Sequence, residues 1–89
     1  MNTEYLPSFL KDIKALKSTP VFESIKALVF EEVPNISSFE EISNLKKMKG
    51  ADNAYRIRVG DYRIGLFFDG DTVKFARVLN RKDIYRYFP

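Results

Sequence analysis

The sequence contains neither histidine nor cysteine. The usual metal-ligand sets and the Ser-His-Asp and Cys-His triads are therefore excluded. Without cysteine there is also no disulfide and no thiolate chemistry, which fits a reducing cytosol. Glycine-rich phosphate loops of the GxxxxGK[ST] and GxGxxG types are missing as well. We therefore expect neither a metal nor a cofactor, and the chemistry left to the chain is that of arginine, lysine and tyrosine.

Long hydrophobic runs are also missing. No apolar stretch approaches the length that spans a membrane, and the N-terminus does not have the pattern of a signal peptide. We therefore expect a cytoplasmic protein with no membrane partner. With 89 residues, of which 45% are hydrophobic and 15% aromatic, the chain is predicted to be one globular domain over residues 1–89.

Charge is unevenly distributed along the chain. Residues 1–45 hold four Lys against seven Asp and Glu, whereas residues 46–89 hold eleven Lys and Arg against five Asp. A basic C-terminal half is typical of proteins that bind phosphate groups or acidic proteins. An ordinary solvated surface explains the charge alone equally well.

The first half of the chain predicts two amphipathic helices joined as an antiparallel hairpin, after a stub of strand at most. The first helix begins at Pro7 and carries Asp12 on its outer face. The second has Thr19 as its N-cap and Pro20 as its first residue, and it ends before Pro34. The residues expected to face the core are Phe9, Leu10, Ile13, Leu16, Val21, Phe22, Ile25, Leu28, Val29 and Val33.

The second half predicts a short helical turn and then a meander of three strands. Residues 38–41 fit a Ser-x-x-Glu capping box. Residues 55–66 alternate between apolar and polar side chains around a tight turn at Gly60 and Asp61. A second turn at Gly70 and Asp71 leads into a third strand over residues 72–80. The fold class is therefore α+β, with two N-terminal helices packed on a small, mainly antiparallel twisted sheet.

The first hairpin carries an unusual charge pattern. Its turn places Arg58 directly opposite Arg63, with Arg56 on the same face. Like charges that face each other on a sheet are destabilising, so this arrangement indicates a face that meets a polyanion or carboxylates. We call Arg56, Arg58 and Arg63 the arginine face, and we expect it to lie open while the helices cover the opposite face.

Four further basic residues are candidates for binding a substrate. Lys46, Lys47 and Lys49 are expected on a mobile loop, where they could equally serve only to keep the loop solvated. A two-residue turn at positions 70 and 71 would place Arg77 on the apolar face, opposite Ile64. Either a β-bulge intervenes, or Arg77 reaches past the edge of the sheet.

The end of the third strand adds Arg81 and Tyr85 to the arginine face. The planar guanidinium fork of arginine suits phosphate and can stabilise a pentacovalent phosphorane, although arginine is a poor general base. A tyrosine can stack on a base or act as a weak acid. For Lys82 and Arg86 we expect surface ion pairs with the acidic helices instead.

Three segments resemble the RelE/ParE superfamily of type II toxin-antitoxin toxins: LKKMKG at 45–50, YRIRVGDYRIG at 55–65 and VLNRKDIYRYFP at 78–89. The resemblance covers nearly the whole chain. It implies two N-terminal helices against a mainly antiparallel sheet, and an antitoxin whose C-terminal segment covers the basic face in a hetero-oligomer. RelE-like members cut mRNA in the ribosomal A site, where a 2′-hydroxyl attacks the adjacent phosphate without a metal ion.

By position, the resemblance also implies roles for the basic residues. Arg63 and Arg81 would contact the scissile phosphate, while Arg56 and Arg58 would position it and stabilise charge. Tyr85 would stack on a base or transfer a proton.

The sequence departs from the superfamily pattern at two places. Asn80 stands where many relatives have a histidine, and an asparagine carries no proton at neutral pH. The N-terminal segment is shorter than usual, so we expect it to lack an edge strand. Three functions therefore stay open: a ribosome-dependent mRNA endonuclease (an mRNA interferase), a ParE-like inhibitor of DNA gyrase, and a degenerate toxin that only binds its antitoxin.

Overall fold

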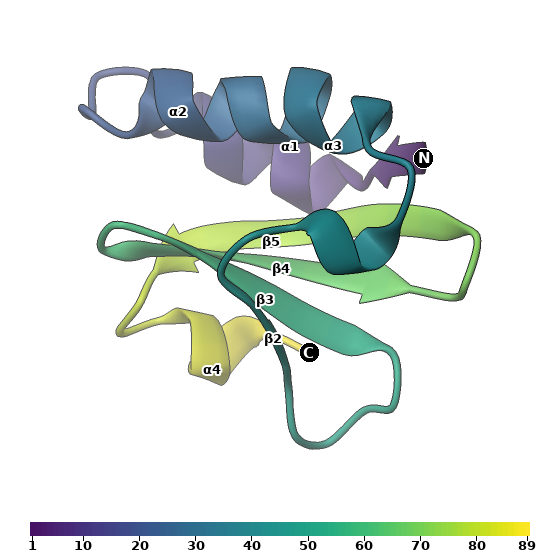
Figure 1. The fold of residues 1–89 in the computed structure, drawn as a ribbon. Coiled ribbons are helices and arrows are strands. Elements are labelled where there is room, and N and C mark those ends of the chain that lie inside the picture. The colour runs from purple at the N-terminus through teal and green to yellow at the C-terminus, as the bar shows by residue number, and fades with distance from the viewer.

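Five strands form one mixed sheet in the order β1-β5-β4-β3-β2 in the computed structural model, which describes residues 1–89 (Figure 1). β1 runs parallel to β5, and the other neighbours are antiparallel. The predicted α+β class is confirmed. The strands are β1 (Asn2–Tyr5), β2 (Leu45–Lys47), β3 (Ala54–Val59), β4 (Tyr62–Phe68) and β5 (Thr72–Asn80).

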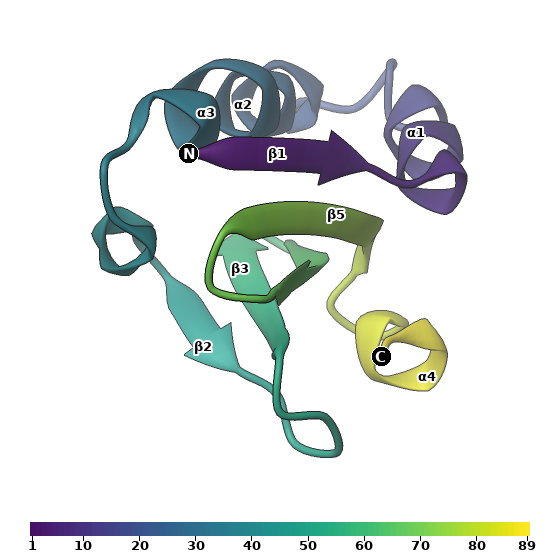
Figure 2. The same cartoon turned by 90° about the vertical axis from the view of Figure 1, so that its right-hand side faces the viewer.

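The helices lie on both sides of this sheet, as Figures 1 and 2 show. One side is covered by α1 and by a second helix with three parts: α2, a π-helical turn and α3. The C-terminal helix α4 lies on the opposite side. None of the helices is long and apolar enough to cross a membrane. Their bounds are α1 (Pro7–Lys14), α2 (Phe22–Ala27), the π turn (Leu28–Glu32), α3 (Val33–Asn35) and α4 (Ile84–Tyr87).

The hairpin of β3 and β4 has the predicted register. Arg58 faces Arg63 and Ile57 faces Ile64 across the two strands. Gly60 has a φ of 59°, which is the left-handed conformation that a tight hairpin turn needs and that glycine adopts without strain. The predicted turn and face assignment are confirmed.

The conflict at Arg77 is resolved by a β-bulge. Leu66 pairs with Phe75 as predicted, but the register of β4 and β5 shifts between Gly65 and Leu66. Beyond this shift, Gly65 rather than Ile64 pairs with Arg77. The extra residue in β5 moves Arg77 off the positions that face the apolar side of the sheet. The apolar residues on either side of it keep those positions.

Two strands were not predicted. The N-terminal stub forms the edge strand β1, so the expectation of a missing edge strand is wrong. Lys46 and Lys47 lie in β2, paired with Arg56 and Tyr55 of β3, and not on a mobile loop. Both strands are short and polar, and each is defined by its partner rather than by an alternating pattern of its own.

Both predicted ends of the second helix are wrong. The hydroxyl of Thr19 donates to the carbonyl of Leu16 at 2.7 Å, so Thr19 is not an N-cap and α2 begins three residues later. The helix also continues through Pro34. The π turn makes this possible. In a π turn the Val29 carbonyl would accept the amide of residue 34, but proline has no N–H. The Val29 carbonyl instead accepts the Tyr5 hydroxyl at 2.6 Å.

The predicted capping box is confirmed, since the Ser38 amide donates to Glu41 Oε2 at 2.7 Å and opens a 3₁₀ turn, Phe39–Glu41.

The main core lies between the helices and the sheet, and it includes most of the predicted positions. Leu10 is an exception, with 45% of its surface exposed. The fully or nearly buried members of the main core are Phe9, Ile13, Leu16, Ile25, Val29, Val33, Phe39, Ile42, Ile57, Ile64, Leu66, Val73, Phe75 and Val78.

A second, smaller core lies on the other side of the sheet. It consists of Met48, Ala54, Ala76, Ile84 and Phe88, so α4 and the residue that follows it pack on the face that we expected to lie open. The arginine face is therefore not a bare sheet surface. It is bounded on one side by the C-terminal segment.

Candidate functional site

The turn between β3 and β4 fixes the position of Arg63. Its Nη1 donates to the carbonyls of Gly60 and Tyr62, each at 2.9 Å. Two carbonyl acceptors hold the guanidinium across the hairpin beside Arg58, which is exposed. The remaining N–H groups of Arg63 stay available to another acceptor.

Arg56 is held by the chain just before β2. Its Nη1 donates to the Asn44 carbonyl at 3.1 Å, and the same carbonyl accepts the Arg58 amide at 3.2 Å. Asn44 has a φ of 62°, a left-handed conformation that asparagine adopts more readily than most residues. The Nε of Arg56 is buried and has no hydrogen-bond partner in the chain. A buried donor without a partner is costly, so Arg56 is held here with one hydrogen bond unmade.

Positive charge accumulates around Arg63. Burial lowers the pKa of Arg63 below its usual value, and the charge of Arg56 lowers it further. Arg58 and Arg81 add smaller effects in the same direction, whereas Tyr85 acts in the opposite direction. Several arginines therefore act on one another without enough negative charge nearby to balance them. An anion bound here would relieve this repulsion.

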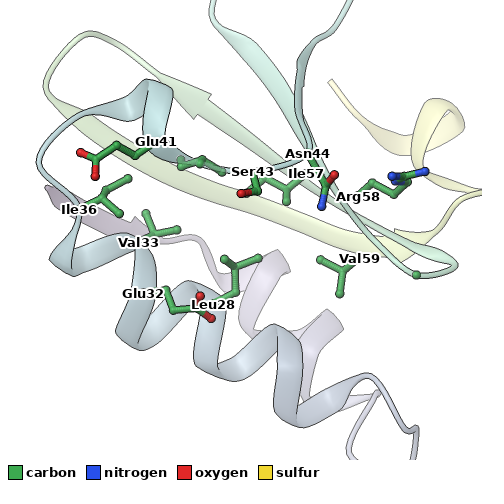
Figure 3. Close-up of a pocket in the computed structure, with 12 residues that line it drawn as sticks. Leu28, Glu32, Val33, Ile36, Glu41, Ser43, Asn44, Ile57, Arg58 and Val59 are labelled. Atoms are coloured by element: carbon green, nitrogen blue, oxygen red, sulfur yellow. The ribbon is translucent and has the colours of Figure 1, made fainter.

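Three hollows surround these side chains. One of them, about 570 Å³, is a groove between the second helix and β3, and we call it the helix groove (Figure 3). The other two lie over the arginine face and share Lys46 and Arg56. One is lined by Asn44, Leu45, Lys46, Arg56, Arg58 and Arg63. The other, about 290 Å³, is lined by Lys46, Lys47, Met48, Lys49, Arg56, Tyr85, Phe88 and Pro89.

The structure thus brings seven of the nine candidate residues to these two adjoining hollows. Arg81 lies close by, after β5: its amide donates to the Asp61 carbonyl at 2.8 Å, and its Nε lies 4.0 Å from Asp61 Oδ1. Asn80 closes the same turn, because its Oδ1 accepts the Lys82 amide at 3.0 Å. The expected ion pairs of Lys82 and Arg86 with the acidic helices are not present; Arg86 lies over the ring of Tyr87.

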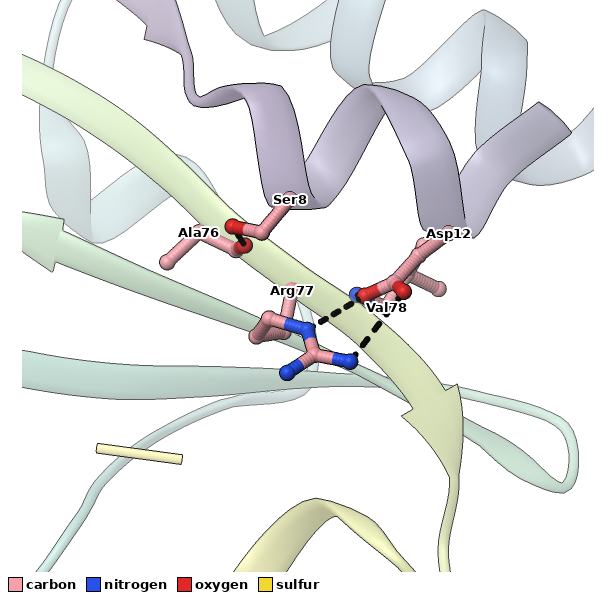
Figure 4. A network of polar contacts seen from close by, with 5 residues as sticks. All are labelled: Ser8, Asp12, Ala76, Arg77 and Val78. Atoms are coloured by element: carbon pink, nitrogen blue, oxygen red, sulfur yellow. Dashed lines mark hydrogen bonds and ion pairs between the residues drawn. The ribbon is translucent and has the colours of Figure 1, made fainter. Parts of the chain in front are cut away.

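Arg77 does not join the group. Its Nε donates to Asp12 Oδ2 at 2.6 Å and its Nη2 to Asp12 Oδ1 at 3.2 Å (Figure 4). The prediction that Asp12 lies on the outer face of α1 is therefore wrong. Phe88 packs on Gly65, which lies between Arg77 and Arg56 in the sheet, so it separates the two arginines. The proposed role of Arg77 in substrate binding is replaced by a structural one.

The Asp12–Arg77 pair closes an open edge of the sheet. β1 covers β5 only as far as Phe75, and α1 supplies the hydrogen bonds beyond it. Ser8 Oγ donates to the Ala76 carbonyl at 2.6 Å, and the Val78 amide donates to Asp12 Oδ2 at 3.1 Å (Figure 4). One helix therefore satisfies the bulged stretch of β5 where no strand does.

Replacing Asp12 by asparagine should destabilise the fold. Asp12→Asn removes the charge that balances Arg77 and weakens bonds to two partners, which should cost about 1–2 kcal/mol. Urea unfolding followed by circular dichroism measures this loss. Asp83→Asn, at an exposed aspartate with no side-chain partner, should leave the midpoint nearly unchanged. Equal midpoints for the two variants would contradict the role given to Asp12.

Comparison with known proteins agrees with this architecture. A family model described as the ParE toxin of the type II toxin-antitoxin system parDE matches residues 3–85. The chain belongs to this toxin family. This match confirms the RelE/ParE resemblance of the sequence. The protein is a toxin of a type II toxin-antitoxin system.

Individual relatives carry the RelE name. Toxin RelE3 of Methanocaldococcus jannaschii is 46% identical to this toxin over 90 residues, with both chains covered completely. In the crystal structure of the RelB-RelE antitoxin-toxin complex from Methanococcus jannaschii, one chain is 45% identical, with a TM-score of 0.78 and coverage of 97% and 99%. YafQ from E. coli shares the fold at 15% identity, with a TM-score of 0.71 and coverage of 91% and 93%.

Proposed function

We propose that this toxin is a metal-independent endoribonuclease that cuts mRNA on the ribosome. The observation that carries the proposal is the cluster of Arg56, Arg58 and Arg63 beside two adjoining hollows. Such a site binds the phosphates of an RNA strand and stabilises charge on them. We propose that residues 1–89 form the one domain that carries this site.

The reaction needs charge stabilisation more than a strong base. The 2′-oxygen forms a bond to the adjacent phosphorus while the bond from phosphorus to the 5′-oxygen breaks. The 2′-hydroxyl loses a proton and the 5′-oxygen gains one, so the products end in a 2′,3′-cyclic phosphate and a 5′-hydroxyl. In this mechanism Arg63 and Arg81 contact the phosphate, and Arg56 and Arg58 neutralise the charge that develops on its oxygens.

Tyr85 has two separable roles in this proposal, stacking on a base and giving a proton. Tyr85 is 64% exposed at the rim of the hollow of about 290 Å³. Tyr85→Ala removes both roles, and Tyr85→Phe removes only the hydroxyl. If stacking dominates, Phe should retain most of the cleavage rate, while Ala should lose about 1–3 kcal/mol of RNA binding. Rates and RNA affinities of both variants, measured side by side, separate these roles.

We propose further that the toxin acts in the cytoplasm and is held inactive in a complex with a cognate antitoxin. The M. jannaschii relative with a similar fold was crystallised as an antitoxin-toxin complex. Asp and Glu side chains of an antitoxin would balance the positive charge around Arg63 and thereby block access of RNA.

Inhibition of DNA gyrase is the second candidate function, because the family model that matches carries the ParE name. Induction of the toxin in cells, followed by mapping of mRNA 5′ ends, separates the candidates. Cleavage within codons supports the proposed endoribonuclease. DNA damage without new 5′ ends supports gyrase inhibition, and absence of toxicity supports a protein that only binds its antitoxin.

A further inference from the structure

The proposed reaction leaves one further hollow of the surface without a role. It measures about 590 Å³ and lies over the connection between β2 and β3, which extends away from the helices at the bottom of Figures 1 and 2. We call it the loop hollow. Its lining residues are Lys47, Met48, Lys49, Gly50, Ala51 and Asp52.

The loop hollow continues the arginine face. It shares Lys47 and Lys49 with the hollow of about 290 Å³ that contains Tyr85. That hollow in turn shares Arg56 with the hollow beside Arg63. An RNA strand whose scissile phosphate lies at Arg63, and whose neighbouring base stacks on Tyr85, therefore reaches the loop hollow with its next nucleotide.

The connection between β2 and β3 is fixed at both of its ends. The Met48 amide donates to the Ala54 carbonyl at 2.8 Å, and the Phe68 amide donates to the Asn53 carbonyl at 2.9 Å. The side chain of Met48 is buried in the smaller core. Gly50 has a φ of 96°, and a Cβ atom there would meet nothing within 4 Å, so the backbone at this position is open to a ligand. A subsite held in this way can distinguish one base from another.

Asp52 is out of place among the charges of this surface. It is the only acidic residue that lines any of the three hollows. It is exposed and forms no ion pair with Lys47 or Lys49, which line the same hollow. A carboxylate repels phosphate, so Asp52 weakens any binding of the RNA backbone. Its oxygens suit the N–H groups of a base instead.

Guanine matches a carboxylate and an ammonium group better than the other bases do. On its Watson–Crick edge, N1–H and N2–H lie side by side and O6 lies next to them. A carboxylate accepts both N–H groups with its two oxygens, while an ammonium group donates to O6. Adenine and cytosine offer one amino group beside a ring nitrogen that only accepts, and uracil offers one N–H between two carbonyls.

We infer that the loop hollow is a guanine-selective subsite for the mRNA, in which Asp52 accepts N1–H and N2–H and Lys49 donates to O6. The base bound here is the second from the cut, on the side of the base that stacks on Tyr85. This inference rests on the proposed endoribonuclease and assigns it a sequence preference. Neither Asp52 nor Lys49 takes part in the transfer of the phosphoryl group.

Asp52→Asn tests the recognition of the base with almost no change in shape. The amide keeps one acceptor and gains a donor, an arrangement that pairs with adenine rather than with guanine. Asp83→Asn is the matched control. It removes the same charge from an exposed aspartate that lines none of the three hollows.

The measurement is cleavage, at subsaturating concentration, of ribosome-bound mRNAs that differ only in the two nucleotides on each side of the cut. With guanine at the second position on one side, the wild type and Asp83→Asn should cut about tenfold faster than with uracil, because a bidentate contact discriminates by about this factor. In Asp52→Asn this ratio should fall below about threefold, and adenine should be preferred to guanine. Its rate on the uracil substrates should stay within about twofold of wild type, which a general loss of folded toxin would not allow.

The outcomes separate the subsite from the function. If the wild type cuts equally fast with each base at this position, or if Asp52→Asn keeps the preference for guanine, the loop hollow does not select a base and the proposed function stands. If the wild type cuts no ribosome-bound mRNA, the endoribonuclease and its subsite are overturned together. A preference for a base other than guanine would overturn the assignment made here.

Discussion

Alanine at both Arg63 and Arg81 should abolish measurable mRNA cleavage on the ribosome. Arg63 is held by two carbonyls beside Arg58, and Arg81 is held at the same turn by Asp61. In the proposed reaction both guanidinium groups contact the phosphate, where negative charge develops in the transition state. Removing one such donor typically costs about 100-fold in rate, so the double variant should lose considerably more. Single-turnover cleavage of a ribosome-bound mRNA measures this loss.

Arg86→Ala is the control for lost positive charge. Arg86 lies on α4 with its guanidinium over Tyr87, outside the two hollows of the arginine face. Its removal changes the net charge as much as one of the site variants does, but it should leave the rate within about twofold, as a surface charge contributes mainly to association. Unchanged cleavage in the Arg63 and Arg81 variant would exclude these arginines from catalysis.

The hairpin at the centre of the site could be predicted because its pattern is local. Alternation around Gly60 determines which side chains face each other, so the register of Arg58 and Arg63 follows from adjacent residues. The opposed arginines already indicated that the face meets negative charge. No contact with distant parts of the chain was needed for either conclusion.

The remainder of the site depends on contacts between distant residues. Asn44 positions Arg56 through a backbone carbonyl that no side-chain pattern reveals. Arg77 has the same charge as Arg56, but it contacts Asp12, 65 residues away in sequence, and Phe88 on Gly65 separates it from Arg56. Charge alone could not distinguish these two arginines, because what differs is the partner that each of them meets.

One local signal for the C-terminal segment was present in the sequence. Gly65 lies inside a strand between Ile64 and Leu66, and a glycine in a strand interior often marks a close approach of another group. In the structure that group is the ring of Phe88, which lies against the Gly65 backbone. The four-residue α4 is too short to be predicted from periodicity, so this glycine was the only indication of what packs here.

Gly65→Ala should therefore dislodge the C-terminal segment. A Cβ atom at position 65 would lie 2.6 Å from Cδ2 and 2.7 Å from Cγ of Phe88, closer than carbon atoms can approach. Since Cγ is near the base of that side chain, the ring must move with its backbone, and Tyr85 moves with it. We expect a loss of about 3 kcal/mol in the free energy of unfolding, the usual upper cost of overpacking. Urea unfolding and cleavage assays should both detect the change.

A double-mutant cycle identifies the clash as the cause. Phe88→Ala removes Cγ and the ring beyond it, so adding Gly65→Ala to that variant should cost much less than adding it to the wild type. Equal costs in the two backgrounds would show that the strand itself, and not Phe88, resists the extra methyl group. Because α4 carries Tyr85, the same cycle measured on cleavage rate tells whether packing at Gly65 positions the tyrosine. The rate of the double variant should then exceed that of Gly65→Ala alone.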